Sequence, residues 1–457
     1  MNRNRKIVVI GAGSAEFGLD SLAGIIRTKG LFGCELVLVD IDETKLRVVE
    51  KLAKRLNLEW RADMNISATT DRTKALPRAG YVILSVAIDR ETSWKNDHML
   101  ALRSGITHYA ENGGPGAFAH TYRNLCLISP ILKDIETLAP YAYLLTFTNP
   151  LTRICTAISK ISSIQNVGIC HGIGSGYWLL ANIMRDELGI KLSPDPRFLW
   201  RDDRINEFEK FQDKAKEKYS IYAAGINHFT WILGVIDKST GEDILSTVKE
   251  KINFLPSSVE PLSQKMFQIF GFIPVTGDTH ITEYVPYTAD AHEGTWNRFD
   301  IQLYDFEWSN NRRLKTIHLM NELGNGHGEI NSLLNARSER AEIIIDSLMN
   351  NILIQEEAVN IPNHGFITNL PEGAIIEIPG KIDSSGINGV KVGNLPSAIA
   401  AVCQRQLCIA DLNVEAFLTH DRKLVYQMFA IDPMIQDPDI AIKLADEYIE
   451  RANGVFH

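Results

Sequence analysis

The sequence has few cysteines, and none of them form a CxxC pair. The six cysteines are scattered over 457 residues. In a reducing compartment this pattern predicts free thiols, most of them small buried residues, and not a disulfide framework.

Long apolar runs and an excess of positive charge are also missing. No run reaches the length of a membrane-spanning helix, and the opening "MNRNRKIVVIGAG" enters a glycine loop too early for a signal peptide. Lys and Arg number 47 against 56 Asp and Glu, which gives a net charge of −9. We therefore expect a cytoplasmic protein that has neither a nucleic acid nor a membrane as its main partner.

The first part of the chain alternates short apolar runs with amphipathic stretches. Such alternation predicts a parallel sheet with right-handed crossovers, that is, an α/β fold with an N-terminal Rossmann-type doubly wound sheet. A helix is expected over 43–56, between polar ends. The expected strands lie in "KIVVIGAG" (6–13), "CELVLVDID" (34–42), "AGYVILSVAI" (79–88), "YAYLLTFTNP" (141–150) and "NVGIC" (166–170).

The pattern changes near residue 200. The stretch 219–237 predicts longer, antiparallel strands, and helices are expected over 312–323, 331–351 and 395–418. We therefore predict a nucleotide-binding domain over 1–200 and an α+β domain for substrate, metal and oligomer contacts over 201–457. No Pro/Gly/Ser-rich linker separates them, so tight packing around a cleft is expected.

A glycine-rich turn follows the first expected strand in "VVIGAGSAEFG". Gly11 allows a tight turn, and Gly13 lets the backbone approach a pyrophosphate at a helix N-terminus. Glu16 replaces the third glycine of the dinucleotide fingerprint, and Ser14 offers a hydroxyl nearby. Asp40 ends the second strand, where a carboxylate can accept hydrogen bonds from ribose hydroxyls. This set predicts an NAD site and favours NAD over NADP, because Asp40 would repel a 2′-phosphate.

Polar side chains follow two later strands. Asn149 ends one strand in "TFTNP", where the Asn–Pro bond could be cis, and Cys170 ends the next; both should face the ligand crevice. His228 lies in "AAGINHFTW", on the first expected strand of the second part. A thiolate and an imidazole could together hold a divalent metal with open positions, although a buried cysteine and a core histidine are the commoner alternatives.

The ordered set "GAGS…LVDID", "TNP", "CHG", "GINHFTW" and "THITEYVPY" resembles glycoside hydrolase family 4. That family consists of NAD- and Mn-dependent glycosidases on a lactate/malate-dehydrogenase-like fold, and the resemblance extends from Lys6 to about Pro433. It implies that Cys170 and His228 hold Mn²⁺. It also implies that Asn149 binds sugar hydroxyls and that Glu111, in "ENGGPGAF", faces the substrate.

The resemblance further implies a redox-assisted elimination, an exception to two-carboxylate glycosidase chemistry. A hydride passes from C3 to NAD⁺, and a base then removes the C2 proton. The C1 oxygen is expelled with the help of an acid. Water adds to the resulting alkene, and the hydride returns from NADH to C3. Tyr284 resembles the base, with Tyr287 as the next candidate. His171, directly after Cys170, occupies the position of the acid in α-specific members. The alternative interpretation of the two tyrosines is that they are packing residues. The alternative for His171 is that it lies beside the metal without acting as an acid.

The stretch "CHG" bears on the substrate. Members that cleave phosphosugars have "CD" or "CN" followed by proline, so this chain resembles enzymes of unphosphorylated α-glycosides. Gly172 resembles the α-uronidase members, which makes α-galacturonidase the preferred prediction, then α-glucuronidase, then α-galactosidase or α-glucosidase. A uronide carboxylate should be bound by an arginine or lysine. Arg90, Arg123 and Arg298 are available, and the sequence does not choose among them.

Two other functions compete with this one. A 2-hydroxy-acid dehydrogenase shares the fold, and "GNGHGE" (324–329) superficially fits its histidine-bearing turn, but it lies late, among expected helices, where a loop fits better. A non-enzymatic NAD sensor would have no use for Cys170, His228 and Tyr284. The family resemblance also suggests a homodimer or homotetramer that acts on a small-molecule glycoside.

Overall fold

The computed structural model describes residues 4–87, 90–109, 111–193, 202–452 and 456. Side chains are described throughout these ranges except at 15–17, 90–91 and 202–203.

The N-terminal part contains the doubly wound sheet that the sequence predicts. Six parallel strands lie in the order β3-β2-β1-β4-β5-β6, which is the dinucleotide-binding order. Every residue of β1 and β4 is buried, as expected when helices cover both faces of a sheet. The strands are β1 (Lys6–Ile10), β2 (Glu35–Val39), β3 (Asn65–Thr69), β4 (Tyr81–Leu84), β5 (Tyr143–Thr146) and β6 (Asn166–Gly168).

Helices connect these strands, and α2 (Glu43–Glu59) shows how the sequence forms them. The Asp42 side chain caps its N-terminus by accepting from the Lys45 N–H. Its buried residues include Leu46, Val49 and Leu52, spaced by three so that they share one face. The other helices of this part are α1 (Ala15–Arg27), α3 (Arg72–Ala75), α4 (Arg90–Arg103), α5 (Gly116–Leu138), α6 (Leu151–Ile161), α7 (Ile173–Ile183) and α8 (Arg185–Leu188), with a 3₁₀ turn, η1 (Lys29–Leu31).

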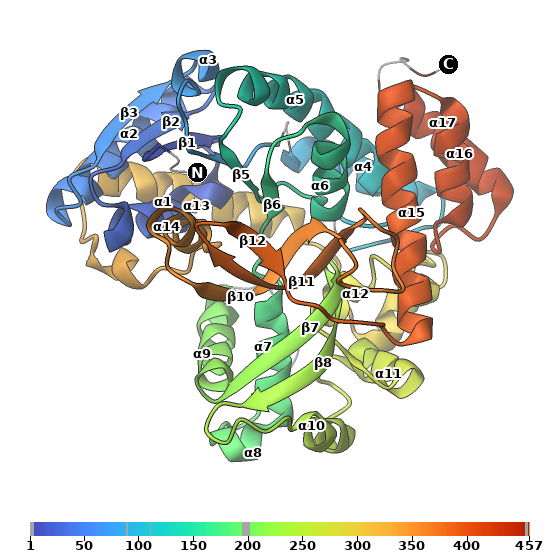
Figure 1. Ribbon diagram of the computed structural model, residues 1–457. Helices are drawn as coiled ribbons and strands as arrows, with labels where there is room; N and C mark the ends of the chain where they lie inside the picture. Colours follow the sequence, from blue (N-terminus) through green and yellow to red (C-terminus); the bar gives the residue numbers. More distant parts are fainter. Residues whose placement is uncertain (1–3, 88–89, 110, 194–201, 453–455, 457) are drawn as a thin grey trace.

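The sheet does not stop at β6. Strand β10 pairs antiparallel with β6 through Asn360 and Gly168, and the order continues β10-β11-β7-β8-β9, with β12 beside β11. One sheet thus carries strands from both parts of the chain (Figure 1). The boundary near residue 200 stays a prediction. These strands are β7 (Tyr219–Ile226), β8 (Phe229–Asp237), β9 (Ile273–Pro274), β10 (Ile354–Pro362), β11 (Ile375–Asp383) and β12 (Gly386–Gly389).

The expected hairpin over 219–237 is present as β7 and β8, whereas the expected helix over 331–351 is wrong in its first half. Residues Asn331–Asn335 form only a 3₁₀ turn, η5, and helix α14 covers Ala341–Asn350. The break is at Arg340, whose φ of +67° is incompatible with a continuing right-handed helix. An ion pair between Arg340 and Glu356 holds that residue against β10.

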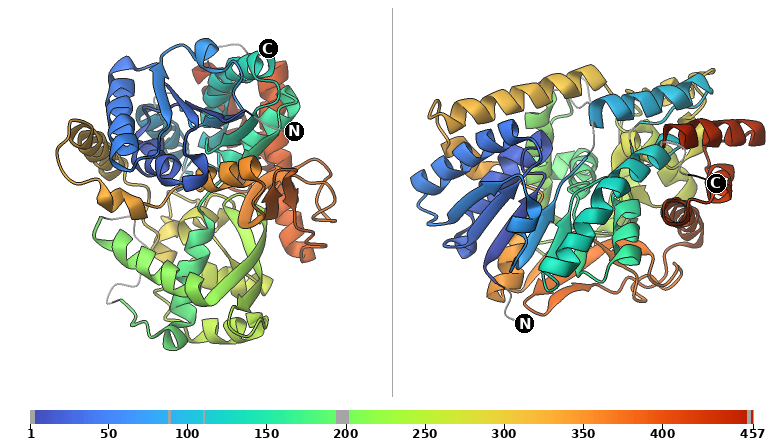
Figure 2. Two further views of the ribbon diagram at one scale, coloured as in Figure 1. Left: turned by 60° about the vertical axis from the view of Figure 1, so that its left-hand side comes forward. Right: turned by 90° about the horizontal axis from the view of Figure 1, so that it is seen from above.

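Helices of the second part flank the N-terminal sheet. Helix α13 packs beside α2, and α15 packs against α6 and α5 (Figure 2). Among the helices that the described residues form, none combines the length and the apolar character needed to cross a membrane. The remaining helices and 3₁₀ turns are α9 (Asp202–Lys218), α10 (Leu245–Lys251), η2 (Ile252–Phe254), α11 (Pro261–Phe270), α12 (Gly277–Ile281), η3 (Pro286–Thr288), η4 (Thr295–Phe299), α13 (Phe306–Gly324), α15 (Ser397–Thr419), α16 (Arg422–Ile431) and α17 (Pro438–Arg451).

Candidate active site

The glycine-rich turn after β1 has the geometry of a nucleotide-binding turn. Gly11 has a φ of +90°, and a Cβ there would lie 2.0 Å from the Ser85 carbonyl oxygen, so only glycine fits. The Gly13 N–H donates to Asp40 Oδ2 at 2.8 Å. Ser14 follows at the start of α1, where its N–H donates to the Gly11 carbonyl at 3.1 Å. The four residues predicted for NAD therefore lie together.

Cys170 and His228 are in contact, although 58 residues separate them. Cys170 Sγ lies 3.2 Å from His228 Nε2. Cys170 comes two residues after β6. The prediction that His228 lies on a strand is wrong: it lies in the two-residue turn between β7 and β8, where its φ of +60° is outside the strand region. The Thr276 hydroxyl donates to the His228 carbonyl at 2.7 Å and so holds this turn. The Gly172 N–H points at Cys170 Sγ from 3.4 Å.

The chemistry of this pair fits a divalent metal. Ligands about 2.3 Å (S) and 2.1 Å (N) from one ion, at a right angle, are about 3.1 Å apart. Burial lowers the pKa of His228, which favours the neutral imidazole that a metal requires. Burial raises the pKa of the Cys170 thiol to about 12, so a nearby positive charge is needed for its thiolate. The buried His228 Nδ1 has no hydrogen-bond partner among the described residues.

His280 and Glu283, which the sequence analysis did not single out, stand behind the pair. The His280 ring stacks on His228 with a centroid separation of 4.1 Å. Its Nδ1 lies 2.6 Å from Glu283 Oε1. Ligand atoms of these three residues lie within 4.8 Å of one another, so they form a second possible donor group. The signal was present in "THITEY", where the histidine and the carboxylate are three residues apart and can therefore meet.

Glu283 also holds the loop that carries Glu111. Its carboxylate accepts from the N–H groups of Asn112 at 2.7 Å and Gly113 at 3.2 Å. A Cβ on Gly113 would lie 1.9 Å from the Glu283 carbonyl oxygen, so the loop packs tightly against this segment. Glu111 is buried, and its charge acts on both His228 and His280, raising their pKa values against the larger effect of burial.

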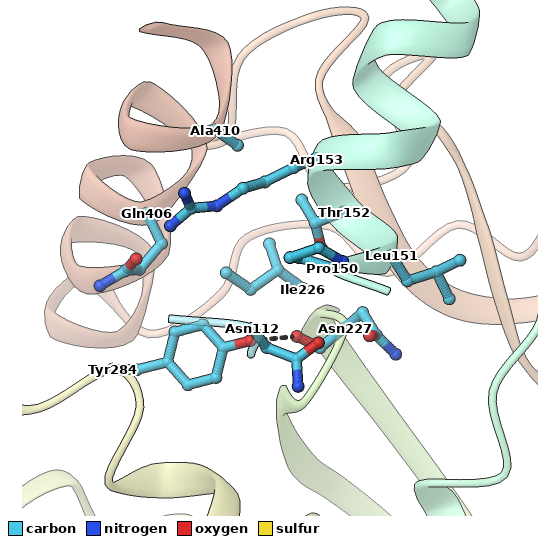
Figure 3. A pocket seen from close by; sticks show the side chains of 10 residues that line it. All are labelled: Asn112, Pro150, Leu151, Thr152, Arg153, Ile226, Asn227, Tyr284, Gln406 and Ala410. Atoms are coloured by element: carbon cyan, nitrogen blue, oxygen red, sulfur yellow. Dashed lines mark hydrogen bonds between the residues drawn. The ribbon is translucent and has the colours of Figure 1, made fainter. Parts of the chain in front are cut away.

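Tyr284 lines a pocket beside these residues (Figure 3). Its hydroxyl donates to the Asn227 carbonyl at 3.1 Å, and its ring stacks on Phe229. Burial raises its pKa well above the usual value, whereas the Arg153 charge lowers it. Tyr287 is 47% exposed and is not part of this pocket. The lining consists of Asn112, Pro150, Leu151, Thr152, Arg153, Ile226, Asn227, Tyr284, Gln406 and Ala410.

Asn149 and His171 lie at the edges of this region. Asn149 is half-buried and directly precedes the lining residue Pro150; the peptide bond between them is cis, as the sequence analysis allowed. Its carbonyl accepts from Asn124 Nδ2 at 2.8 Å. His171 is next to Cys170, but its side chain is 68% exposed and its Nδ1 contacts Glu339 Oε1.

The arginines that the sequence offered for a carboxylate do not line the pocket where the structure describes them. Arg123 pairs with Asp97 at 2.5 Å, and Arg298 is 70% exposed. The Arg90 side chain lies outside the described residues. Arg153 does line the pocket, and the sequence analysis missed it because it lies inside a stretch with an ordinary helical pattern. Burial lowers the pKa of Arg153 to about 10.

The segment "GNGHGE" lies away from these residues. It follows α13, and His327 within it is 68% exposed and pairs with Glu322. This placement agrees with the interpretation as a loop after a helix.

Comparisons with known proteins identify the family. The model described as family 4 glycosyl hydrolase matches residues 6–184, and the model of that family's C-terminal domain matches residues 223–435. An alpha-glucosidase of Erwinia rhapontici is 30% identical over 98% of this chain and 97% of its own length. An alpha-galacturonidase of Bacillus subtilis (strain 168) is 25% identical over 94% of this chain and 93% of its own length.

Solved structures share the fold. A 6-phospho-alpha-glucosidase from gut microorganisms, in complex with NAD and Mn²⁺, has a TM-score of 0.78 at 19% identity and 99% coverage of both chains. The 6-phospho-beta glucosidase from Thermotoga maritima with manganese, NAD⁺ and glucose-6-phosphate has a TM-score of 0.76 at 20% identity and the same coverage. The matched models cover most of the sequence, and the chain therefore belongs to the family 4 glycosyl hydrolases.

Proposed function

We propose that this protein is an NAD⁺- and Mn²⁺-dependent glycosidase of unphosphorylated α-uronides, with α-galacturonides preferred and α-glucuronides next. The observation that carries the proposal is the contact of Cys170 Sγ with His228 Nε2, 3.2 Å apart and close to the pocket that Tyr284 lines. A thiolate and an imidazole leave most of a metal's coordination sphere to substrate oxygens and water. Relatives named for glycosidase activities and a fold shared with NAD- and Mn²⁺-bound structures support it.

The residues around the turn after β1 would hold NAD. Gly11 and Gly13 let the backbone approach the pyrophosphate, and Ser14 lies at the N-terminus of α1. Asp40 uses one oxygen for the Gly13 N–H and the other for the Asp42 N–H. Each carboxylate oxygen has a second lone pair, which leaves acceptors for ribose hydroxyls. When bound, NAD⁺ accepts and returns a hydride, and Mn²⁺ acts as a Lewis acid on the sugar oxygens.

Proton transfers fall to this chain's own side chains. Tyr284 removes the C2 proton, and the nearby Arg153 charge favours its ionised form against the effect of burial. Glu111 lies buried near Cys170 and His228 and faces the substrate. Asn149 binds sugar hydroxyls. His171 protonates the leaving oxygen from the rim of the site, where Glu339 orients its ring. Because His171 is largely exposed, the leaving group can depart toward solvent.

The uronide preference rests on Gly172 and on relatives named alpha-galacturonidase. A Cβ at position 172 would lie 3.3 Å from Thr276 Cγ2 and 3.6 Å from Cys170 Sγ. Any longer side chain would therefore enter the space beside the metal pair, and glycine keeps that space open. The second candidate is a neutral α-glucosidase or α-galactosidase, which the 30% identity to the Erwinia rhapontici alpha-glucosidase favours.

Hydrolysis assays test the proposal. The p-nitrophenyl α-galacturonide, α-glucuronide, α-galactoside and α-glucoside would be compared with NAD⁺, Mn²⁺ and a thiol reductant, each additive being omitted in turn. We expect uronide cleavage that stops without NAD⁺ or Mn²⁺. Cleavage of neutral glycosides alone would reject the uronide preference. Cleavage that is indifferent to NAD⁺ and metal would reject the mechanism, and net NADH formation from a 2-hydroxy acid would favour the dehydrogenase.

A further inference from the structure

The pocket contains a buried guanidinium that makes no direct ion pair with a described residue. Arg153 is 4% exposed and lies in the first turn of α6. Its Nη1 donates to Asn413 Oδ1 at 2.8 Å, and this is its one hydrogen bond to the described residues. No carboxylate oxygen of the described residues lies within 4.0 Å of the guanidinium, which is the limit for an ion pair. The buried Asp432 carboxyl is the strongest charge acting on Arg153, but it lies beyond ion-pair distance. Because a buried cation without a direct ion pair is costly, a carboxylate in the pocket would stabilise Arg153 further.

Two other pocket residues have unused polar groups. Gln406, on α15, is buried and makes no side-chain hydrogen bond to a described residue. Asn112 Oδ1 is buried and has no hydrogen-bond partner within the described part of the chain, although the Asn112 amide nitrogen faces Glu283. Figure 3 shows the Arg153 guanidinium reaching from α6 toward Gln406. Arg153 and Gln406 together offer several N–H donors, which suit an oxygen-rich anion.

We infer that Arg153 binds the C6 carboxylate of the uronide substrate and determines the preference for uronides over neutral sugars. This inference rests on the proposed function. A guanidinium presents two parallel N–H donors that match a planar carboxylate. Arg153 is the one cation among the described lining residues, and none of them is acidic. A single positive charge balances a monoanionic carboxylate, whereas a phosphate dianion would call for a second cation.

The position of Arg153 suits a sugar whose reactive carbons, C2 and C3, lie on the side of Cys170 and His228. Asn227 directly precedes His228, the proposed metal ligand. Figure 3 shows Asn227 and Arg153 on opposite sides of Ile226. In a pyranose, C2 and C3 lie across the ring from the C6 substituent. A sugar with C2 and C3 toward Tyr284 and the metal pair would thus direct its C6 group to the Arg153 side.

The test compares wild type, Arg153→Met, Arg153→Lys and the matched control Arg298→Met, which removes an exposed arginine. We expect kcat/KM for the α-galacturonide, relative to that for the α-galactoside, to fall about 10²- to 10³-fold in Arg153→Met, because a buried charge-assisted contact is lost. The lysine variant should recover part of this loss, since it restores the charge but not the fork. Arg298→Met should behave as wild type.

A binding measurement supplies an independent readout. Wild type should gain thermal stability with D-galacturonate and not with D-galactose, and Arg153→Met should lose this gain. If wild type cleaves uronides and Arg153→Met keeps the same substrate ratio, the inference is wrong and the proposed function stands. If wild type neither cleaves nor binds uronides, both the uronide proposal and the role of Arg153 fail. Should Arg153→Met not fold, Arg153→Lys decides, because an unchanged ratio there would overturn the bidentate contact.

Discussion

Substituting Gly11 by alanine should damage both stability and NAD binding, and Gly33→Ala is a matched control. Both glycines have positive φ values, +90° and +74°. A Cβ on Gly33 would meet no described atom within 4 Å, whereas a Cβ on Gly11 would lie 2.0 Å from the Ser85 carbonyl oxygen. Positive φ costs an alanine about 1–2 kcal/mol. The clash, which forces the backbone of two strands apart, adds about 1–3 kcal/mol at Gly11 alone.

These energies correspond to measurable shifts in Tm. With about 2.1 cal/mol/K of unfolding entropy per residue, a chain of 457 residues loses about 1 °C per kcal/mol. Gly33→Ala should therefore lower Tm by about 1–2 °C, and Gly11→Ala by about 2–5 °C. Gly33 precedes β2, at the end of the sheet opposite the nucleotide, so only Gly11→Ala should weaken NAD binding. Each loss of about 1.4 kcal/mol of contact with NAD should raise the Kd about tenfold.

Differential scanning fluorimetry and calorimetric titration with NAD⁺ measure the two effects. The clash argument is refuted if Gly11→Ala is no less stable than Gly33→Ala. The assignment of the turn to NAD is refuted if Gly11→Ala is destabilised and still binds NAD⁺ with wild-type affinity.

Three further predictions concern the proposed metal ligand Cys170, the proposed acid His171 and the buried carboxyl of Asp432. Cys170→Ser should reduce Mn²⁺ retention after dialysis and turnover by more than about 100-fold, and Cys408→Ser, at an exposed cysteine, should change neither; retained Mn²⁺ would contradict the ligand assignment. His171→Ala should slow alkyl α-glycosides far more than p-nitrophenyl ones, because nitrophenolate leaves without an acid, and equal slowing would exclude the acid role. Burial raises the pKa of Asp432 from 3.8 to about 6, so the folded state binds this proton more tightly than the unfolded state does. The resulting stabilisation, about 3 kcal/mol at low pH, is lost as pH rises from below 3.8 to above 6. About 1.4 kcal/mol of it is lost between pH 5 and 7.5. Asp432→Asn should remove this component, so its Tm relative to wild type should be higher at pH 7.5 than at pH 5, and a constant difference would contradict the burial argument.

Strand ends are where the sequence was most informative about the site. Cys170 and Asn149 were expected in the crevice because side chains at the carboxyl ends of parallel strands share one edge of the sheet. His228 was expected opposite, and it lies 3.2 Å from Cys170. Continuous apolar runs also predicted β1 and β2, and apolar periodicity predicted α2, because burial leaves a pattern in the residues themselves.

The missed features depend on contacts between distant segments. Strand β10 contains "IQEEAVNIP", whose acidic residues hide the strand pattern, and its Glu356 is compensated by Arg340. Arg153 has the spacing of any helical residue, and its importance arises only when α6 packs against α15. A single sequence records such pairings weakly, since each partner satisfies an ordinary local rule.

The seam between β6 and β10 has a consequence for how the protein is made. A chain released or cut near residue 200 would contain all six parallel strands, but the edge of β6 would be open to pairing with other chains. About 150 more residues must be synthesised before β10 covers that edge. The Cys170–His228 pair also joins residues on the two sides of this seam. Contact between Cys170 and His228 therefore reports complete folding, and a half-length fragment should both aggregate and lack activity.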